Sequence, residues 1–336
     1  MKSIRKSLLL IVVLLLSFVV VGCKKDVEEE DPIKIGILQY VTHDALDAAR
    51  LGFIEVLEEE GFVDGDNIVI EVLNPQTDAT LMQQQAAKLV RESDLILAIA
   101  TSAAQAVVTE AEGQGKDTPI LFTAVTDPVD AGLVASMANP GGNVTGTSDM
   151  NPVADQVELL KQIKPTATKI GVLYTASEPN SEIQAEIAQT AATALGLAVE
   201  TRTITSLNDI TSAVTNLITA AGVDAIYIPT DNLLASSMGA LEELIKEYAT
   251  YKVFLICGET AQVRNGGSIT FGLSYFNLGR DTGAMAVRIL NGTAPKDIPS
   301  TTVQTFELVI NKAQLEDDLG LTIPTTLLES ADELIE

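Results

Sequence analysis

The sequence has few of the residues that enzymes use for chemistry. Its 336 residues include no Trp, one His (His43) and two Cys (Cys23 and Cys257), and 4% are aromatic. A single His argues against a Ser-His-Asp triad or a His-based metal site. No phosphate-binding Gly-x-x-x-x-Gly-Lys-Ser/Thr loop and no Gly-x-Ser-x-Gly elbow occurs, and Gly113-x-Gly115 lacks the third glycine of a dinucleotide fingerprint. We therefore expect no enzymatic activity, no cofactor and no metal.

Residues 1–22 have the pattern of a lipoprotein signal peptide. Lys2, Arg5 and Lys6 precede an apolar run over residues 8–21, which is shorter than the roughly 20 residues of a membrane-spanning helix. The run ends in Val-Val-Gly-Cys, the pattern before which lipoprotein signal peptidase cuts, so Cys23 is predicted to carry the lipid. The alternative is an ordinary secretory signal with a chance cysteine. Lipidation would place the protein in the cell envelope, outside the cytoplasm, held to the membrane through Cys23 alone.

Residues 23–32 are predicted to be a solvated tether, because Val27 is their one apolar side chain before Pro32. With Cys23 lipidated, Cys257 has no partner for an internal disulfide, and the preceding Phe-Leu-Ile predicts a buried strand thiol. The formal net charge is −25, and removal of Lys2, Arg5 and Lys6 makes it −28. Such an acidic surface argues against nucleic acid or anionic lipid as a partner.

The mature chain repeats one pattern, which predicts its fold class. KIGIL at 34–38 recurs as KIGVL at 169–173, and each phrase is followed by an alternation of amphipathic helices with apolar strands. The first series has strands near 67–73, 94–100 and 119–125, and the second has strands near 198–204, 224–228 and 252–256. Continuous apolar strands between helices indicate parallel strands covered on both faces. The sequence therefore predicts an α/β protein with two doubly wound parallel-sheet lobes.

Polar residues gather where the predicted strands end. Ligands of open parallel sheets bind outside the carboxyl ends of the strands, so these residues form the candidate ligand site. Helix N-termini capped by Thr101 and Ser102 would hold a carboxylate, and Asp127, Asp231 and Glu259 would hold an ammonium group. Helix capping alone is the competing interpretation for each single residue. The candidate ligand-binding residues are Gln39, His43, Thr101, Ser102, Thr126, Asp127, Ser148, Tyr174, Asn180, Ser181, Asp231, Asn232, Glu259 and Tyr275.

Longer phrases resemble one protein family. They are IGILQ at 35–39, ALDAARLGF at 45–53, FTAVTDPV at 122–129, PGGNVTG at 140–146 and PTDN at 229–232. These phrases are similar to the ABC-transporter substrate-binding family that includes tryptophan- and tyrosine-binding lipoproteins, over residues 33 to about 323. The resemblance implies a type I periplasmic-binding-protein fold with three crossover strands. One departure is Asp44, where relatives are expected to have Pro.

The resemblance also implies a small-molecule ligand, most simply an aromatic amino acid, and a separate ABC permease and ATPase as partners of a monomer. Without Trp, an aromatic ligand would stack on Tyr40, Tyr174 or Tyr275. Lobe one is predicted to comprise residues 33–148 and about 277–302, and lobe two residues 149–276 and about 303–336. A ligand sensor, a surface adhesin and a nucleoside or sugar receptor remain alternatives on the same fold.

Overall fold

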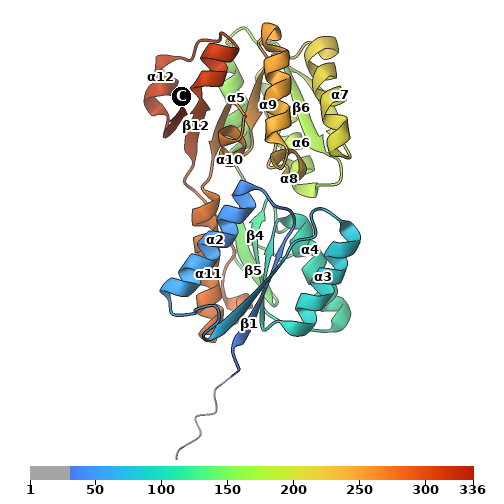
Figure 1. Cartoon of the computed structure of the whole chain (residues 1–336), viewed down its shortest axis with the longest axis vertical. Coiled ribbons are helices and arrows are strands. Elements are labelled where there is room, and N and C mark those ends of the chain that lie inside the picture. Colours follow the sequence, from blue (N-terminus) through green and yellow to red (C-terminus); the bar gives the residue numbers. More distant parts are fainter. Residues whose placement is uncertain (1–30) are drawn as a thin grey trace, which may run out of the picture. The chain divides into compact units, whose positions relative to one another are not determined.

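The computed structural model describes residues 31–336, and Ile33–Glu336 form one compact unit (Figure 1). The predicted signal peptide, the lipidation site Cys23 and most of the predicted tether lie outside the described residues. Within the described part of the chain, no helix combines the length and the apolar character needed to cross a bilayer.

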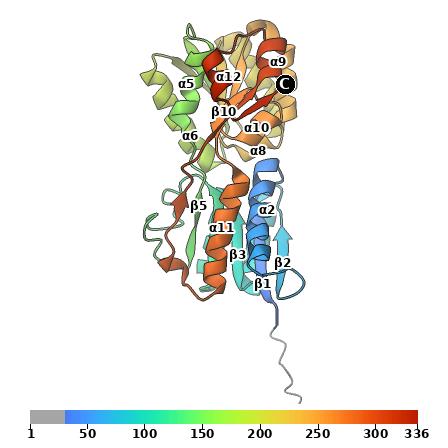
Figure 2. The same cartoon turned by 90° about the vertical axis from the view of Figure 1, so that its left-hand side faces the viewer.

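Lobe one is built on a six-stranded sheet in the order β11-β5-β4-β3-β1-β2, and every neighbouring pair is parallel. Helices α2 and α11 cover one face of this sheet, and α3 and α4 cover the other (Figures 1 and 2). The elements are β1 (Ile33–Gln39), α2 (Asp44–Glu59), β2 (Ile68–Leu73), α3 (Ala79–Glu92), β3 (Leu95–Ile99), α4 (Thr101–Gln114), β4 (Ile120–Val125), β5 (Val144–Ser148), α11 (Tyr275–Leu290), η4 (Pro295–Asp297) and β11 (Thr301–Thr302).

Lobe two is built on a seven-stranded sheet in the order β13-β12-β10-β9-β8-β6-β7. All pairs are parallel except β10 with β12. The elements are α5 (Val153–Ile163), β6 (Lys169–Thr175), α6 (Pro179–Ala194), β7 (Ala198–Ile204), η1 (Leu207–Asp209), α7 (Ile210–Thr215), η2 (Asn216–Ala221), β8 (Ala225–Ile228), α8 (Asn232–Ala235), α9 (Met238–Glu247), η3 (Ala249–Tyr251), β9 (Phe254–Cys257), α10 (Thr260–Arg264), β10 (Ile269–Gly272), β12 (Glu307–Asn311), η5 (Ala313–Asp318), α12 (Thr325–Ser330) and β13 (Glu333–Ile335).

The chain passes between the two sheets three times, after β5, after β10 and after β11. The predicted fold class is therefore confirmed: two doubly wound α/β lobes are joined by three crossings. Helix α11 packs in lobe one, and β12 belongs to the sheet of lobe two. At the chain end β13 follows α12 and pairs with β12, which the sequence analysis did not predict. A three-residue strand after a short helix is too brief to give a periodic sequence signal.

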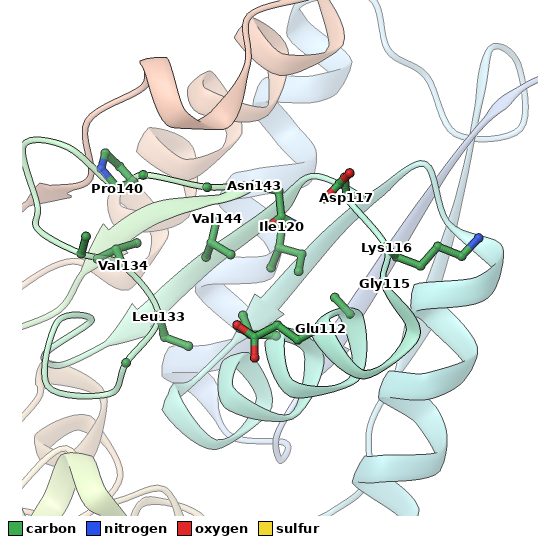
Figure 3. A pocket seen from close by; sticks show the side chains of 16 residues that line it. Glu112, Gly115, Lys116, Asp117, Ile120, Leu133, Val134, Pro140, Asn143 and Val144 are labelled. Atoms are coloured by element: carbon green, nitrogen blue, oxygen red, sulfur yellow. The ribbon is translucent and has the colours of Figure 1, made fainter.

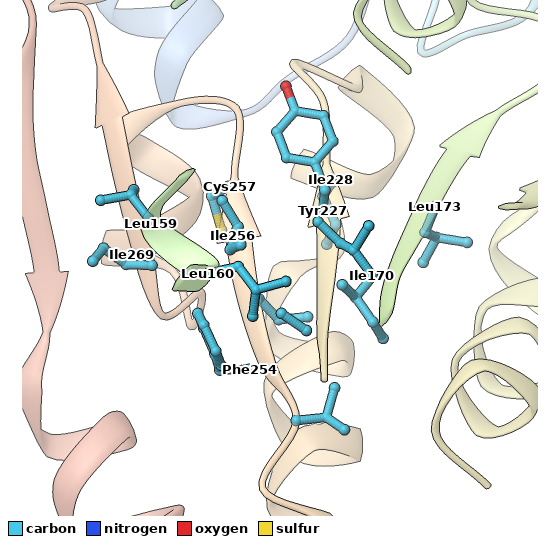
Figure 4. Close-up of a cluster of buried hydrophobic side chains, with 14 of the residues drawn as sticks. Leu159, Leu160, Ile170, Leu173, Tyr227, Ile228, Phe254, Ile256, Cys257 and Ile269 are labelled. Carbon is cyan, nitrogen blue, oxygen red and sulfur yellow. The ribbon is translucent and has the colours of Figure 1, made fainter. Parts of the chain in front are cut away.

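Each lobe has its own hydrophobic core, centred on its sheet. In lobe two, side chains of β6, β8 and β9 meet those of α5 (Figure 4). Tyr227 is fully buried in this core, and its hydroxyl donates to Gln156 Oε1 at 3.0 Å, so the polar end of the ring is satisfied. Cys257 is also fully buried in β9, as predicted. Burial raises the pKa of the Cys257 thiol, which keeps it unreactive.

Helices α2 and α11 approach so closely that their backbones touch. A Cβ atom on Gly279 would lie 1.9 Å from the Ala49 carbonyl oxygen, and one on Gly52 would lie 2.1 Å from the Phe276 carbonyl oxygen. Beside this contact, Arg280 of α11 forms a salt bridge with Glu59 of α2, with 2.8 Å between Nη2 and Oε2. Helix α2 begins directly after His43 and α11 begins at Tyr275. The close packing therefore fixes the relative position of two candidate site residues.

Candidate functional site

Hydrogen bonds cross between the lobes at the carboxyl ends of their strands. His43, which follows β1, is 3.1 Å from Asn232 Oδ1, which follows β8. Gln184 of α6 donates to Thr126 after β4 at 3.4 Å, and Asn265 after α10 donates to Asp44 at 2.9 Å. The candidate site, here called the interlobe site, comprises the buried polar residues at these strand ends. Asp44, where the resemblance led us to expect Pro, thus makes a contact between the lobes.

A directed chain of hydrogen bonds sets the tautomer of His43. Asn232 donates from Nδ2 to Glu178 Oε2 at 2.6 Å, so its Oδ1 atom is an acceptor. His43 Nε2, which faces that oxygen, must then carry the proton. Burial lowers the pKa of His43, so the ring is neutral and its Nδ1 atom is an acceptor.

His43 Nδ1 faces a second acceptor. Glu259 Oε1 lies 3.9 Å away, and neither atom has a hydrogen-bond partner. Both side chains are buried, with 9% of His43 and 2% of Glu259 exposed. Buried polar atoms of this kind are nearly always hydrogen-bonded in folded proteins. Two opposed acceptors call for a donor between them, such as the N–H groups of an ammonium ion.

Four buried carboxyl groups lie at the interlobe site, and no Lys or Arg among the described residues pairs with any of them. Burial raises the pKa values of Asp149, Glu178, Asp231 and Glu259, and that of Glu259 reaches about 8. Neighbouring carboxyls add to the effect, because Asp149 acts on Glu259 and Asp231 acts on Glu178. The site is therefore rich in negative or protonated groups and poor in positive charge.

Tyr275 lies beside two of these carboxyls. Its hydroxyl donates to Asp149 Oδ2 at 2.6 Å, and Glu259 is its other acidic neighbour. Thr126 supports Asp149 from the end of β4 at 3.2 Å. Asp149 lies in the first crossing between the lobes and Tyr275 begins the helix after the second. Residues at the crossings between the lobes are therefore part of the interlobe site.

Three further buried oxygens at the site have no partner: Thr101 Oγ1, Asn151 Oδ1 and Asn180 Oδ1. With His43 Nδ1 and Glu259 Oε1, they make up five of the six such atoms in the described residues, and the sixth belongs to Gln85 on α3. Orphaned polar atoms concentrated at one place indicate where a polar ligand would complete the hydrogen bonding.

The N-terminus of α4 differs in detail from the sequence-based expectation. Thr101 and Ser102 lie in the first helical turn and do not cap the helix. The N-cap is Ala100, which makes no side-chain cap and has a φ of 84°, a conformation that costs alanine about 1–3 kcal/mol. Ser102 lies near Tyr40, whose pKa is raised to about 12 by burial and by Glu178 and Asp231 of the other lobe. The uncapped amide groups of α4 remain free for an anion.

Several predicted ligand residues are occupied by contacts within the protein. Gln39 bonds Asp47 and Arg50, and the Asp127 carboxylate accepts from the backbone amides of Val129 and Asp130. Asp231 accepts from Thr175 and Leu234, and Ser181 accepts from Asn180. The observed contacts of these residues are thus the capping and packing contacts that were the alternative to ligand binding.

Of the other residues predicted to bind the ligand, some lie at the interlobe site and some make structural contacts next to it. The Ser148 hydroxyl donates to the Thr126 carbonyl oxygen at 2.8 Å, which links the ends of β5 and β4. Tyr174 packs against the core of lobe two and lies beside Glu182 and Glu186 of α6. The contacts of the site bring together His43, Thr126, Asn180, Asn232, Glu259 and Tyr275, with Thr101 and Ser102 beside Tyr40.

Sequence reasoning missed three residues of this site, Asp149, Asn151 and Gln184, and it placed Glu178 at a strand end without including it among the ligand-binding residues. Asp149 directly follows β5, so the strand-end rule would have included it, but the segment was assigned only to a crossover. Glu178 stands at a strand end and accepts from the amides of Asn232 and Leu233. Gln184 lies inside α6, where no local pattern marks it.

A surface cavity of about 560 Å³ lies away from these residues (Figure 3). Its lining includes Glu112 and Lys116 near the end of α4 and the first residues of β4 and β5, Ile120 and Val144. These are the amino ends of the strands, whereas the interlobe site is at their carboxyl ends. No candidate ligand residue lines the cavity.

Comparisons with known proteins show the family to which the chain belongs. The model of a family described as ABC transporter substrate binding protein matches residues 34–335. The tyrosine-binding protein of Clostridioides difficile is 40% identical over 293 residues, which cover 87% of this chain and 82% of that protein.

Two solved structures are also similar. An ABC domain from Streptococcus pneumoniae in complex with L-Trp is 38% identical, covers 91% of this chain and 100% of its own, and has a TM-score of 0.84. The other is a ligand-free, open structure of a substrate binding protein with adhesive properties from Clostridium difficile. It is 40% identical, covers 90% of this chain and 98% of its own, and has a TM-score of 0.67.

Proposed function

Because the chain belongs to the family of ABC transporter substrate binding proteins, we propose that it captures an amino acid between its lobes and delivers it to an ABC importer. The most probable ligands by similarity are tyrosine and tryptophan, because one relative is a tyrosine-binding protein and another was solved with L-Trp. The importer would supply a separate permease and ATPase.

The opposed acceptors His43 Nδ1 and Glu259 Oε1 carry this proposal. An ammonium group has three N–H donors and a positive charge, so it satisfies both acceptors and compensates the buried carboxylate. Asn151 and Asn180 offer further unpartnered amide oxygens at the same site. A sugar or nucleoside hydroxyl could donate to these atoms but would bring no positive charge to this cluster of buried carboxyl groups.

The carboxylate of the ligand is assigned to the N-terminus of α4. Its first amides lack a side-chain cap, and Thr101 Oγ1 is buried without a partner. A helix of 14 residues directs a partial positive charge at this end. The site therefore has one end, at Glu259, that favours the ammonium group of an amino acid and another, at the start of α4, that favours its carboxylate.

Closure of the lobes around the ligand completes the proposed mechanism. The chain superposes better on the L-Trp complex than on the ligand-free, open relative, although the two identities are similar. The contacts of His43 with Asn232 and of Asp44 with Asn265 hold the lobes together. A ligand that touches both lobes favours the closed form by its differential affinity for that form. We assign the aromatic positions beside the ligand to Tyr40 and Tyr275, which are buried at the interlobe site.

The remaining parts of the proposal concern location. We assign lipidation to Cys23 and an extracytoplasmic, membrane-anchored monomer to the mature chain, on the sequence pattern of residues 1–32.

Thermal unfolding of residues 24–336 with a ligand panel tests the proposed function. This segment contains the whole compact unit Ile33–Glu336. L-Tyrosine or L-tryptophan at a hundred times its Kd should stabilise the protein by about 2.7 kcal/mol, because it binds only the folded form. Common sugars and nucleosides should give no shift. A shift with a nucleoside or sugar alone would contradict the amino-acid assignment.

Adhesion is a second candidate function, because one relative is described as having adhesive properties. Deletion of the gene separates the two. Loss of amino-acid uptake with normal attachment to host cells supports transport, and loss of attachment with normal uptake supports adhesion.

A further inference from the structure

Glu259 is buried without a group that would stabilise its charge. The Tyr275 hydroxyl has a single proton, which it donates to Asp149 Oδ2 at 2.6 Å, so Glu259 does not receive it. The three side chains are buried, with 3% of Asp149, 2% of Glu259 and 4% of Tyr275 exposed. A carboxyl group that is buried without a cation favours its neutral form, so we take Glu259 of the ligand-free protein as a neutral carboxylic acid.

The surroundings of Glu259 favour that neutral form. The groups that face it from other elements are His43 and Asp44 before and at the start of α2, Asp149 after β5, Glu178 before α6, Tyr275 on α11 and the Cys257 thiol on β9. On its own helix, Arg264 is engaged with Glu333 at 2.6 Å. His43 is neutral, so no cation compensates Glu259 in the described residues.

An unpartnered atom marks where a ligand would change this state. Glu259 Oε1 has no hydrogen bond and faces His43 Nδ1 at 3.9 Å. Resting on the proposed function, we propose that the ammonium group of the ligand enters at this place in exchange for the proton of Glu259. The O–H bond of Glu259 breaks, its proton leaves to solvent, and the resulting carboxylate accepts a hydrogen bond from the ammonium group.

This exchange links affinity to pH. Burial and the neighbouring carboxyls raise the pKa of Glu259 to about 8 in the ligand-free protein, whereas the ammonium group stabilises the carboxylate. Below about pH 8, the ligand must therefore displace a proton, and the affinity should rise about tenfold for each pH unit. Above that pH the carboxylate is already free and the affinity should no longer rise through this group.

Calorimetric titration tests the exchange. L-Tryptophan and L-tyrosine are titrated into residues 24–336 at about pH 7 in buffers of different ionisation enthalpy, which gives the number of protons released. We expect nearly one proton per ligand for the unchanged protein and none for Glu259→Gln. Asp281→Asn is the matched control, because Asp281 is an exposed carboxyl of α11 with a raised pKa outside the site. This variant should release the same number of protons as the unchanged protein.

The possible results distinguish a failure of the proposed proton exchange from a failure of the proposed amino-acid binding. Binding of either amino acid without proton release would overturn the exchange and leave the proposed function intact. Release that persists in Glu259→Gln would assign the proton to Glu178 and Asp231 and would likewise overturn it. Absence of binding by both amino acids would overturn the function and the exchange together.

Discussion

Glu259→Gln is expected to weaken amino-acid binding at least a hundredfold at about pH 8 without unfolding the protein. A buried carboxylate paired with an ammonium group typically loses 2–5 kcal/mol or more when one partner is removed, and about 2.7 kcal/mol corresponds to a hundredfold change. The amide keeps the size of the side chain, so the loss reports on charge. Calorimetric Kd values for L-tryptophan and L-tyrosine provide the measurement.

The same variant should not cost folding stability, because Glu259 Oε1 has no partner to lose. The sign of the pH dependence follows from the raised pKa of about 8. Between the pKa of the unfolded state, about 4.5, and that of the folded state, the folded protein binds more protons. The contribution of Glu259 to stability is therefore complete below this range and is lost as the pH rises through about 8. Glu259→Gln should flatten this decline in the thermal midpoint of the ligand-free protein.

Asp231→Asn is the matched comparison for this test. The Asp231 carboxylate accepts hydrogen bonds from Thr175 and Leu234, and the variant should destabilise the fold by about 1–3 kcal/mol for each group left unsatisfied. A weakened affinity in this variant would then accompany a lower midpoint. If Glu259→Gln instead lowered the midpoint and kept its affinity, Glu259 would be a structural residue.

Gly279→Ala is expected to destabilise the protein by about 3 kcal/mol, near the upper end of typical overpacking costs. The added Cβ atom would lie 1.9 Å from the Ala49 carbonyl oxygen, and backbone atoms cannot move aside as a flexible side chain can. The gain in helix propensity, about 1 kcal/mol, offsets part of the clash. For a chain of this size the thermal midpoint should fall by roughly 6–12 °C.

Gly113→Ala is the control for this substitution. Gly113 lies near the end of α4, and a Cβ atom there would meet nothing within 4 Å. Alanine should therefore leave stability unchanged or raise it by about 0.5–1 kcal/mol. Equal midpoints for Gly279→Ala and the unchanged protein would show that α2 and α11 do not pack backbone to backbone.

The fold was predictable because its pattern is local and repeated. The KIGIL and KIGVL phrases became β1 and β6, and the strand predicted at 198–204 matches β7 (Ala198–Ile204). Apolar runs of five to seven residues between helices leave few alternatives to a parallel sheet. Strand β13 was not foreseen, because its pairing with β12 depends on tertiary contacts.

The site was predictable in its place but less so in its individual residues. Strand ends located His43 and Glu259, because topology alone brings those ends together. Sequence could not show that Asp127 caps its own turn or that Gln39 bonds Arg50, since such contacts compete with ligand binding for the same side-chain atoms. Gln184 reaches Thr126 from inside a helix and so depends on how the lobes meet.

The most direct measurement compares L-tryptophan with indole-3-propionate, which lacks only the amino group, by calorimetric titration of residues 24–336. If Glu259 and His43 hold the ammonium group, the amino acid binds and the deaminated compound binds at least about a hundredfold more weakly. Equal affinities for the two compounds would contradict the assignment of an ammonium group to the interlobe site.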